Sequence, residues 1–248
     1  MQRREFIRNS LIAATLPTFG NEIVENTPLS TKGENTRFLF QGDSITDGNR
    51  GRNNDLNHIL GHGYVFSIAS KLGFDLPEKQ FHFVNRGISG NKITDLVARW
   101  EKETIDIKPQ ILSILVGVND TAAAVNGDTA FTKDSFEDGY RNLLKQTKAV
   151  LPDIALVICE PFILPVGKVK DKWDVYSIEI QRRQEVVLKL SKEFNAIFIP
   201  FQTHFNAILK KAPADYWMWD GIHPMPAGHE LMAREWIKTV GKKVRFIK

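Results

Sequence analysis

Short apolar segments alternate with longer amphipathic segments along this chain, and this alternation constrains the fold more than any other feature. Apolar runs at residues 37–41, 81–85, 111–116, 155–159 and 196–200 have the length of buried β-strands. The spacing of amphipathic helices is found at residues 64–72, 94–104, 135–150, 175–194 and 227–240. Ser135 is the expected N-cap of the third helix. Because strict alternation of strands and helices is typical of parallel sheets covered on both faces, the sequence predicts an α/β fold, a three-layer α/β/α sandwich around a five-stranded parallel sheet.

Length and composition agree with one domain of this kind. The chain has 248 residues, of which 42% are hydrophobic and 25% charged, and a single core can grow to about 250 residues before a chain divides. The formal charge of +4 is spread over interspersed lysines and arginines, so it does not indicate a nucleic-acid partner. The lone cysteine, Cys159, excludes an internal disulfide and lies in an apolar run, where we expect a core residue.

The first 36 residues differ in composition from the rest. Residues 1–20 contain the pair Arg3-Arg4 and a short uncharged stretch interrupted by Pro17, and they resemble a twin-arginine export signal. A disordered basic arm is the alternative. The apolar part is shorter than the roughly 20 residues that cross a bilayer, so we expect no stable membrane insertion of the mature protein. The sequence thus predicts a signal at 1–20, a polar linker at 21–36, a folded domain at 37–248 and a periplasmic or extracellular location.

Glycine and polar residues are concentrated where three of the predicted strands end. The segments are Gly42-Asp-Ser-Ile-Thr-Asp-Gly48 after the first strand, Asn85-Arg-Gly-Ile-Ser-Gly-Asn91 after the second and Gly117-Val-Asn-Asp120 after the third. A fourth polar segment, Asp220-Gly-Ile-His-Pro224, precedes the last predicted helix. Ligands of open parallel sheets bind beyond the carboxyl ends of the strands. These turns are therefore where a functional site is expected.

The residues in these turns suit acyl transfer. Ser44 could act as a nucleophile if a base removes its proton and a third group orients that base, and Asp220 and His223 could supply both functions. Acyl transfer also needs hydrogen-bond donors for the oxyanion, and the backbone N–H groups of Ser44 and Gly90 and the amide of Asn119 are candidates. Taken singly, Ser44 could equally be a helix N-cap and Asp220 part of a simple turn. The joint pattern favours the catalytic interpretation.

The four segments together resemble the ordered sequence blocks of the SGNH/GDSL hydrolases, and the similarity extends over residues 37–236. The only departure is Ile45, where the family name has leucine, and it affects no catalytic group. The resemblance implies the flavodoxin-like SGNH hydrolase fold and a serine esterase without metal or cofactor. It implies a triad of Ser44, Asp220 and His223, and an oxyanion hole of Ser44, Gly90 and Asn119.

Within this family, several segments are similar to bacterial acetylxylan esterases and related carbohydrate deacetylases. They are Gly63-Tyr-Val65, Asn85-x-Gly-Ile-Ser-Gly-Asn91, Ala98-Arg-Trp-Glu101 and Trp219-Asp-x-x-His-Pro-x-x-Ala-Gly-His229. This similarity implies an acylated carbohydrate substrate, O-acetylated in the first place. Aromatic faces pack well against sugar rings, and three aromatic residues adjoin the triad in the sequence: Tyr216, Trp217 and Trp219.

Two other functions stay open, a lysophospholipase or thioesterase that acts on longer acyl chains and a non-enzymatic carbohydrate-binding module. Residues 121–133 and 162–173, which we expect to be loops, contain both apolar and charged residues and would decide the acyl-chain length. A homo-oligomer is compatible with the sequence.

Other polar and aromatic residues near the motifs have simpler explanations. His58 and His62 lack the compact spacing of a metal site, and His229 falls inside the last predicted helix. We expect structural roles for His229, for Asp43, Asp47 and Asp120 as acceptors of backbone hydrogen bonds, and for Trp100 and Trp236 in the core.

Overall fold

The computed structural model describes residues 33–53 and 55–247, so the predicted export signal and most of the predicted linker lie outside the described residues. The sheet has the order β2-β1-β3-β4-β5, and every neighbouring pair is parallel. The strands are β1 (Arg37–Gly42), β2 (His82–Asn85), β3 (Ile111–Leu115), β4 (Ala155–Cys159) and β5 (Ile197–Ile199). This is the flavodoxin-like strand order, and it confirms the predicted fold class.

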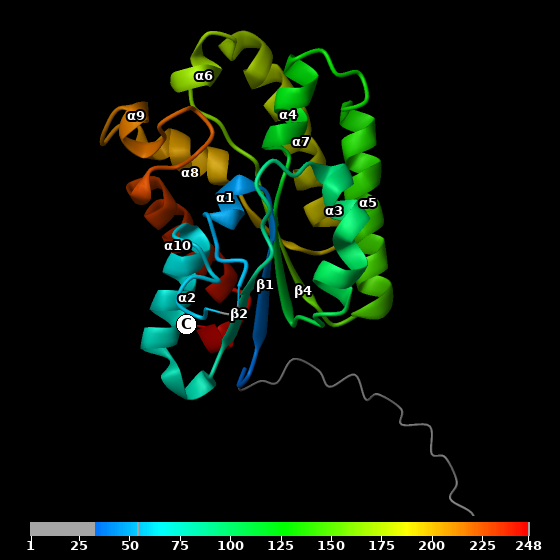
Figure 1. Ribbon diagram of the computed structural model, residues 1–248, viewed down its shortest axis with the longest axis vertical. Helices are drawn as coiled ribbons and strands as arrows, with labels where there is room; N and C mark the ends of the chain where they lie inside the picture. Colours follow the sequence, from blue (N-terminus) through cyan, green and yellow to red (C-terminus); the bar gives the residue numbers. More distant parts are fainter. Residues whose placement is uncertain (1–32, 54, 248) are drawn as a thin grey trace, which may run out of the picture.

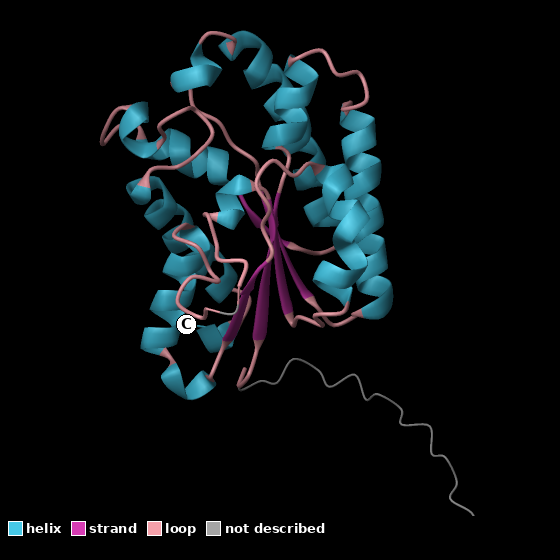
Figure 2. Cartoon of the chain, viewed as in Figure 1, coloured by secondary structure: helices cyan, strands magenta, loops and turns pink. Residues whose placement is uncertain are grey.

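Helices cover both faces of the sheet (Figures 1 and 2). One face packs against α2 (Tyr64–Asp75) and α10 (Pro226–Gly241), and the other against α3 (Ile93–Trp100), α5 (Lys133–Val150) and α7 (Trp173–Glu193). The side chains of β1 alternate accordingly, because successive residues of a strand point to opposite faces. Phe38 and Phe40 join the cluster beneath α2 and α10, whereas Leu39 joins the other cluster.

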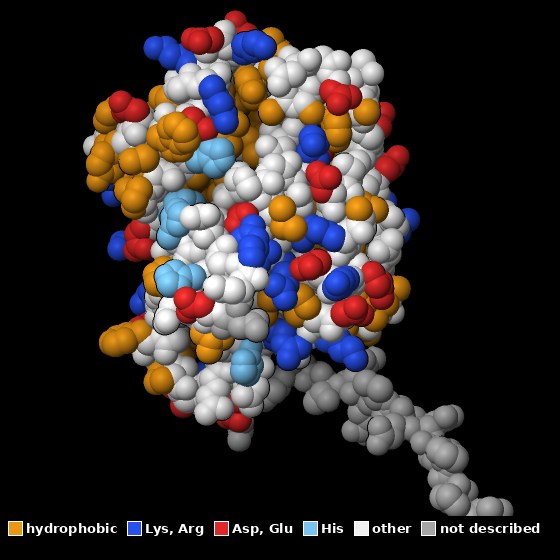
Figure 3. Space-filling view, viewed as in Figure 1, with side chains coloured by type: hydrophobic (Ala, Val, Ile, Leu, Met, Phe, Trp, Pro, Cys, Tyr) orange, Lys and Arg blue, Asp and Glu red, His pale blue; other side chains and the backbone are white. Residues whose placement is uncertain are grey.

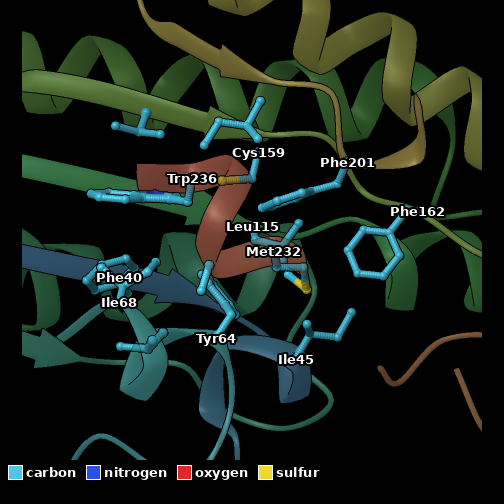
Figure 4. Close-up of a cluster of buried hydrophobic side chains, with 14 of the residues drawn as sticks. Phe40, Ile45, Tyr64, Ile68, Leu115, Cys159, Phe162, Phe201, Met232 and Trp236 are labelled. Atoms are coloured by element: carbon cyan, nitrogen blue, oxygen red, sulfur yellow. The ribbon is translucent and has the colours of Figure 1, made fainter. Parts of the chain in front are cut away.

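The two cores contain the aromatic residues that the sequence assigned to them. Trp236 is fully buried and donates from Nε1 to Ser113 Oγ at 3.0 Å, and Trp100 donates in the same way to Thr147 Oγ1 at 3.0 Å. Each indole N–H thus has a partner inside the core, as a buried polar group requires. Cys159 is also fully buried, near Trp236 and Phe201 (Figure 4). The core roles predicted for Trp100, Trp236 and Cys159 are confirmed.

The described residues contain helices that the sequence pattern did not predict. These are α1 (Ser44–Asp47), α4 (Val118–Val125), α6 (Gly167–Lys170), α8 (Phe201–Ile208) and α9 (Ala214–Trp217), together with 3-10 turns at Pro77–Lys79 and Arg245–Ile247. The last part of the predicted helix 94–104 is a π-helical turn at Glu101–Ile105. Most are too short to show a period of 3.6 residues. Part of the predicted loop 121–133 is therefore helical. The N-cap prediction was wrong, because Thr132 caps α5 by accepting the N–H of Ser135 at 3.1 Å.

The short helices α1, α4, α6, α8 and α9 gather at the carboxyl-terminal end of the sheet (Figure 1). This end carries the four sequence blocks, since α1 follows β1 and α4 follows β3. Among the described helices, none is both long and apolar enough to span a bilayer.

Candidate active site

Ser44 is fixed at the point where β1 passes into α1. The strand ends at Gly42, where a Cβ would lie 2.2 Å from the carbonyl oxygen of Leu115, so only glycine allows β1 and β3 to approach this closely. Asp43 caps α1 by accepting the N–H of Ile45 at 3.0 Å, and Ile45 points into the core (Figure 4). The residues on both sides are thus anchored. Ser44 itself is half-buried, with its hydroxyl outside the core.

Asp220 and His223 lie on a tight turn closed by an antiparallel bridge between Met218 and Pro224. Asp220 Oδ1 accepts two backbone N–H groups, from Ile222 at 2.9 Å and from His223 at 2.7 Å. These bonds fix the plane of the carboxyl group. Its other oxygen, Oδ2, therefore faces the imidazole, and the distance to His223 Nδ1 is 2.8 Å.

The structure brings Ser44, His223 and Asp220 into one hydrogen-bonded series. Ser44 Oγ lies 2.8 Å from His223 Nε2. Burial favours the neutral carboxyl of Asp220, but hydrogen bonds from His223, Lys168 and Ile222 outweigh it and lower the pKa of Asp220 to about 2. An ionised carboxylate can only accept, so Nδ1 of His223 must carry a proton toward it. In the neutral imidazole Nε2 is then free to accept the proton of the Ser44 hydroxyl.

A lysine that sequence reasoning missed also contacts Asp220. Lys168 of α6 places Nζ 2.9 Å from Asp220 Oδ2, the oxygen that also faces His223. The approach depends on Gly167, which has a φ of +52° and where a Cβ would lie 2.4 Å from Asp220 Cα. The sequence signal was weak, since it consisted of one glycine before two basic residues in a predicted loop. Lys168 adds positive charge beside the carboxylate and helps to keep it ionised.

The three candidate donors for an oxyanion come from separate turns. Gly90 has a φ of +84°, and a Cβ there would meet no atom within 4 Å, so glycine is required by the backbone conformation and leaves the space above it open. The Asn119 amide donates to the carbonyl of Asn91 at 3.0 Å, which orients it and leaves its second hydrogen available. Within the described ranges, the backbone N–H groups of Ser44 and Gly90 donate to no protein acceptor.

Three aspartates hold these turns in place, as the sequence predicted. Besides Asp43, Asp47 accepts the N–H of Ser89 at 3.0 Å and Asp120 accepts that of Ile93 at 3.1 Å. Burial raises the pKa of Asp43 to about 7 and that of Asp120 to about 6. The bracing role of Asp43, Asp47 and Asp120 is confirmed.

The three aromatic residues that adjoin the triad in the sequence differ in exposure. Trp219 is 65% exposed, and its ring stacks on the His223 ring at a centroid distance of 6.3 Å. Tyr216 is 57% exposed and packs edge-on against Trp217. Trp217 is half-buried against the core and donates from Nε1 to Ala212 O at 3.1 Å. The faces available to a ligand are therefore chiefly those of Trp219 and Tyr216.

Other histidines lie apart from the series. His229 accepts the backbone N–H of Tyr64 at Nδ1 over 3.1 Å and links α10 to α2, which confirms its structural role. Burial lowers the pKa of His229 to about 4, so it is neutral at physiological pH. His58 is exposed and pairs with Asp55 at 2.6 Å, and His62 is also exposed. Across the described part of the chain, no three metal-binding side chains converge on one point.

Comparison with known proteins agrees with this architecture. The model of the GDSL-like lipase/acylhydrolase family matches residues 40–231. Acetylxylan esterase of Geobacillus stearothermophilus is 34% identical over 217 residues, which are 84% of this chain and 95% of that protein. Its crystal structure has a TM-score of 0.75 to this chain, covering 85% of this chain and 96% of that one. A structure from Parabacteroides merdae, described as a GDSL-like lipase, is 41% identical with a TM-score of 0.80 and covers 84% and 96% of the two chains.

The five-stranded parallel sheet, its helical layers and its likeness to these structures define the three-layer α/β/α sandwich of GDSL-type hydrolases. The family match spans most of the chain and includes all four sequence blocks. The chain belongs to the GDSL-like lipase/acylhydrolase family and is a carboxylic ester hydrolase.

Proposed function

We propose that this protein is a serine esterase that removes O-acetyl groups from polysaccharides or oligosaccharides, with Ser44, His223 and Asp220 as its catalytic triad. One observation carries the proposal, the unbroken series from Ser44 Oγ through the His223 ring to Asp220 Oδ2, with both contacts at 2.8 Å. A serine hydroxyl is a weak nucleophile at neutral pH and needs a positioned base, which in turn needs an orienting group. This geometry suits both needs.

In the proposed mechanism, Ser44 Oγ attacks the ester carbonyl while His223 Nε2 takes its proton. The carboxylate of Asp220 stabilises the imidazolium that forms. The N–H groups of Ser44 and Gly90 and the amide of Asn119 donate to the oxyanion of the tetrahedral intermediate. His223 then protonates the departing alcohol, and the acyl group stays on Ser44. Water, activated by the same imidazole, releases the carboxylic acid and restores the free serine.

Burial of the apolar residues after β4 supports a short acyl group. Residues 162–173 include the apolar sequence that could have lined a groove for a long acyl chain. Phe162, Ile163 and Leu164 are instead fully buried in the core, and α6 follows them with Lys168 pointing at Asp220. A lipase-like or thioesterase-like groove would need exposed apolar side chains beside the triad. In this segment the apolar side chains of Phe162, Ile163 and Leu164 pack in the core and line no groove beside the triad.

The exposed aromatic residues support a carbohydrate as the alcohol part of the ester. Trp219 lies against the imidazole of His223 and presents a broad apolar face to solvent, and Tyr216 is exposed on the neighbouring helix α9. Such faces stack on the apolar faces of sugar rings. We propose Trp219 and Tyr216 as the main substrate contacts, with Trp217 packed edge-on against Tyr216.

The relatives support the same assignment. Solved structures of the Geobacillus esterase include catalytic mutants in which a serine, an aspartate and a histidine are each replaced by alanine, and the aspartate and histidine are three positions apart. Asp220 and His223 have the same spacing here. In another mutant of that esterase the tryptophan immediately before the aspartate is replaced, and Trp219 holds that position in this chain.

Replacement of the nucleophile tests the mechanism. Ser44→Ala should abolish hydrolysis of p-nitrophenyl acetate while circular dichroism and melting temperature stay close to wild type, because the side chain lies outside the core. Ser67→Ala, at a half-buried serine of α2 away from the sequence blocks, is a matched control that should retain activity. Undiminished turnover by purified Ser44→Ala would refute the assignment.

The substrate is tested by measuring acetate release from a panel of acetylated xylan, pectin and oligosaccharides, alongside p-nitrophenyl esters of increasing chain length. We expect kcat/KM to fall steadily beyond acetate. A maximum at long acyl chains would favour the lysophospholipase or thioesterase alternative, and no turnover of any ester would favour a binding module.

We also propose that residues 1–20 direct export and that the folded enzyme begins near Arg37. The composition of the first 20 residues supports this, as does partial similarity to a lipoprotein of Bacillus subtilis that is 25% identical over 127 residues. Fusion of residues 1–36 to a reporter that is active only after export tests the signal, with Arg3→Lys and Arg4→Lys together expected to block transport.

A further inference from the structure

A cavity whose lining contains no residue of the triad lies beside the edge strand β2. It has a volume of about 680 Å³, and its lining includes Arg50, Arg52, Arg86, Glu103, Leu56 and Phe83. Volumes of this size are typical of sites for small organic molecules. Lys and Arg side chains gather on this face of the molecule below the short helices (Figure 3). We call this cavity the arginine pocket.

Charges in the arginine pocket do not balance. Arg52 pairs with Asp47 at 2.6 Å, and Arg86 lies 3.0 Å from Glu103. Arg50 donates from Nε to a backbone carbonyl, but within residues 33–53 and 55–247 its two Nη atoms have no hydrogen-bond partner. Three guanidinium groups therefore face two carboxylates, and one positive charge is left over.

This excess is concentrated on Arg50. Burial, together with repulsion by the guanidinium groups of Arg52 and Arg86, lowers the pKa of Arg50 to about 10, although Asp47 and Glu103 partly offset this effect. The group is still charged at neutral pH and is partly desolvated, and among the described residues no carboxylate lies within ion-pair distance of it. A partly buried cation of this kind is stabilised by an anion that enters the pocket.

The shape and chemistry of the pocket select among anions. Guanidinium groups present a planar fork that matches the oxygens of carboxylates and phosphates. The pocket also has an apolar wall, which includes Phe83 and the side chain of Leu56, 80% exposed. An inorganic ion would fill only part of the volume and would leave that wall uncovered. An organic anion about the size of a sugar unit would use both the charge and the wall.

The arginine pocket adjoins the segment that leads to the proposed oxyanion hole. Arg50 Nε donates to the carbonyl of Gly87 at 2.9 Å, three residues before Gly90. Asp47, the partner of Arg52, ends the short helix α1 that begins with Ser44. One helical turn, about 5 Å along the axis, thus separates the nucleophile from the carboxylate that holds Arg52 at the pocket. A chain bound at Ser44 could place a neighbouring unit there.

We propose that the arginine pocket binds the carboxylate of an acidic sugar unit, so that the enzyme prefers acyl esters on acidic carbohydrate chains. The choice of a carbohydrate rests on the function proposed above, whereas the oxyanion chemistry rests on the pocket alone. Free phosphate shares that chemistry, and the experiment therefore compares the two anions directly.

Isothermal titration calorimetry of the purified protein tests binding without requiring activity. Glucuronate should bind saturably and more tightly than inorganic phosphate, and xylose, a neutral sugar, should not bind at this site. Arg50→Gln should weaken glucuronate binding by on the order of tenfold, since it removes a charged donor. Glu103→Gln should strengthen binding severalfold, because it removes the opposing carboxylate. Arg234→Gln, the same charge change at an exposed side chain of α10, should leave the affinity unchanged.

Equal affinity of wild type and Arg50→Gln for glucuronate would overturn the pocket assignment. Binding of phosphate without glucuronate would overturn the assignment to a sugar carboxylate. Should Arg50→Gln fold poorly, the opposite change expected for Glu103→Gln still tests the charge argument, because a merely structural arginine predicts no gain.

Kinetics connect the pocket to the substrate. With acetylated oligosaccharides that differ only in carrying a uronic acid, Arg50→Gln should raise KM for the acidic substrate relative to the neutral one by about tenfold, with the ratio of the two kcat values unchanged. An unchanged KM ratio would refute the substrate preference. Failure of the proposed esterase function would show as absent turnover of both substrates, while the calorimetric result would still decide the pocket.

Discussion

Replacement of one carboxylate oxygen of Asp220 by an NH2 group is expected to reverse the tautomer of the neutral His223 ring. In Asp220→Asn, the amide can sit in two ways. The two backbone N–H groups that approach Oδ1 at 2.9 and 2.7 Å require an acceptor there, so the carbonyl oxygen stays at that position. The NH2 group then takes the place of Oδ2, 2.8 Å from His223 Nδ1, and Lys168, whose side chain is 54% exposed, loses its contact there and turns to solvent. A donor at this place forces Nδ1 to accept and leaves the proton on Nε2.

The expected loss of activity is large because the imidazole can no longer act as a base toward Ser44. With the proton on Nε2, the 2.8 Å contact to Ser44 Oγ has the wrong direction for removing the hydroxyl proton. An equivalent change in a serine protease triad lowers kcat about 10⁴-fold, which corresponds to about 5 kcal/mol at 1.36 kcal/mol per tenfold change. The fold should persist, since the bonds to Oδ1 remain.

The measurement is kcat for p-nitrophenyl acetate, compared among wild type, Asp220→Asn and Asp220→Ala. The alanine variant also removes the acceptor of the two backbone N–H groups, so it should lose thermal stability together with activity, whereas the asparagine variant should keep a melting temperature close to wild type. Nitrogen-15 NMR of the His223 ring should show protonation at Nδ1 in wild type and at Nε2 in Asp220→Asn. Activity of Asp220→Asn within tenfold of wild type, or a His223 ring still protonated at Nδ1 in that variant, would refute the reasoning.

Three further predictions concern the same end of the sheet. Asn119→Ala should lower kcat by on the order of a hundredfold with a smaller effect on KM, measured with p-nitrophenyl acetate, because one donor to the oxyanion is lost. Gly90→Ala should fold but lose activity, since a φ of +84° is strained for alanine although the space around a Cβ is open. Gly42→Ala should fail to fold, because its Cβ would lie 2.2 Å from a backbone oxygen. Soluble yield and kcat, measured for both variants, distinguish the two outcomes. Asp43→Asn should reduce the pH dependence of stability. The folded pKa of Asp43, about 7, exceeds the unfolded value of 3.8, so the wild-type free energy of unfolding should fall as pH rises from about 4 to 7. Chemical denaturation of both proteins across that range should show a smaller fall for the variant.

Local patterns in the sequence were sufficient for the fold class. The five strands lie where apolar runs predicted them, to within one residue or two at each end, because a buried parallel strand is apolar throughout and is read without knowing its neighbours. The amphipathic pattern predicted the long helices equally well. It did not predict helices of four residues, such as α6 and α9, because they span little more than one turn and are stabilised by the residues that they pack against.

For the candidate site, sequence blocks predicted which residues should meet, because four short motifs in order at strand ends are a specific pattern. The sequence could not show that Lys168 shares Asp220 Oδ2 with His223. Nor could it show that Phe162 and its neighbours are buried in the core, because whether an apolar side chain in a connection faces the core or the solvent depends on how the whole segment folds back.

The sequence by itself thus determined the order and type of the main elements and the identity of the residues that adjoin the strand ends, since each follows from local periodicity or a local motif. Only the tertiary structure decided the contact of Lys168 with Asp220, the exposure of Trp219 and the unpaired charge of Arg50. Each of these depends on contacts or burial among segments that are distant in the chain, and no local pattern encodes such a contact.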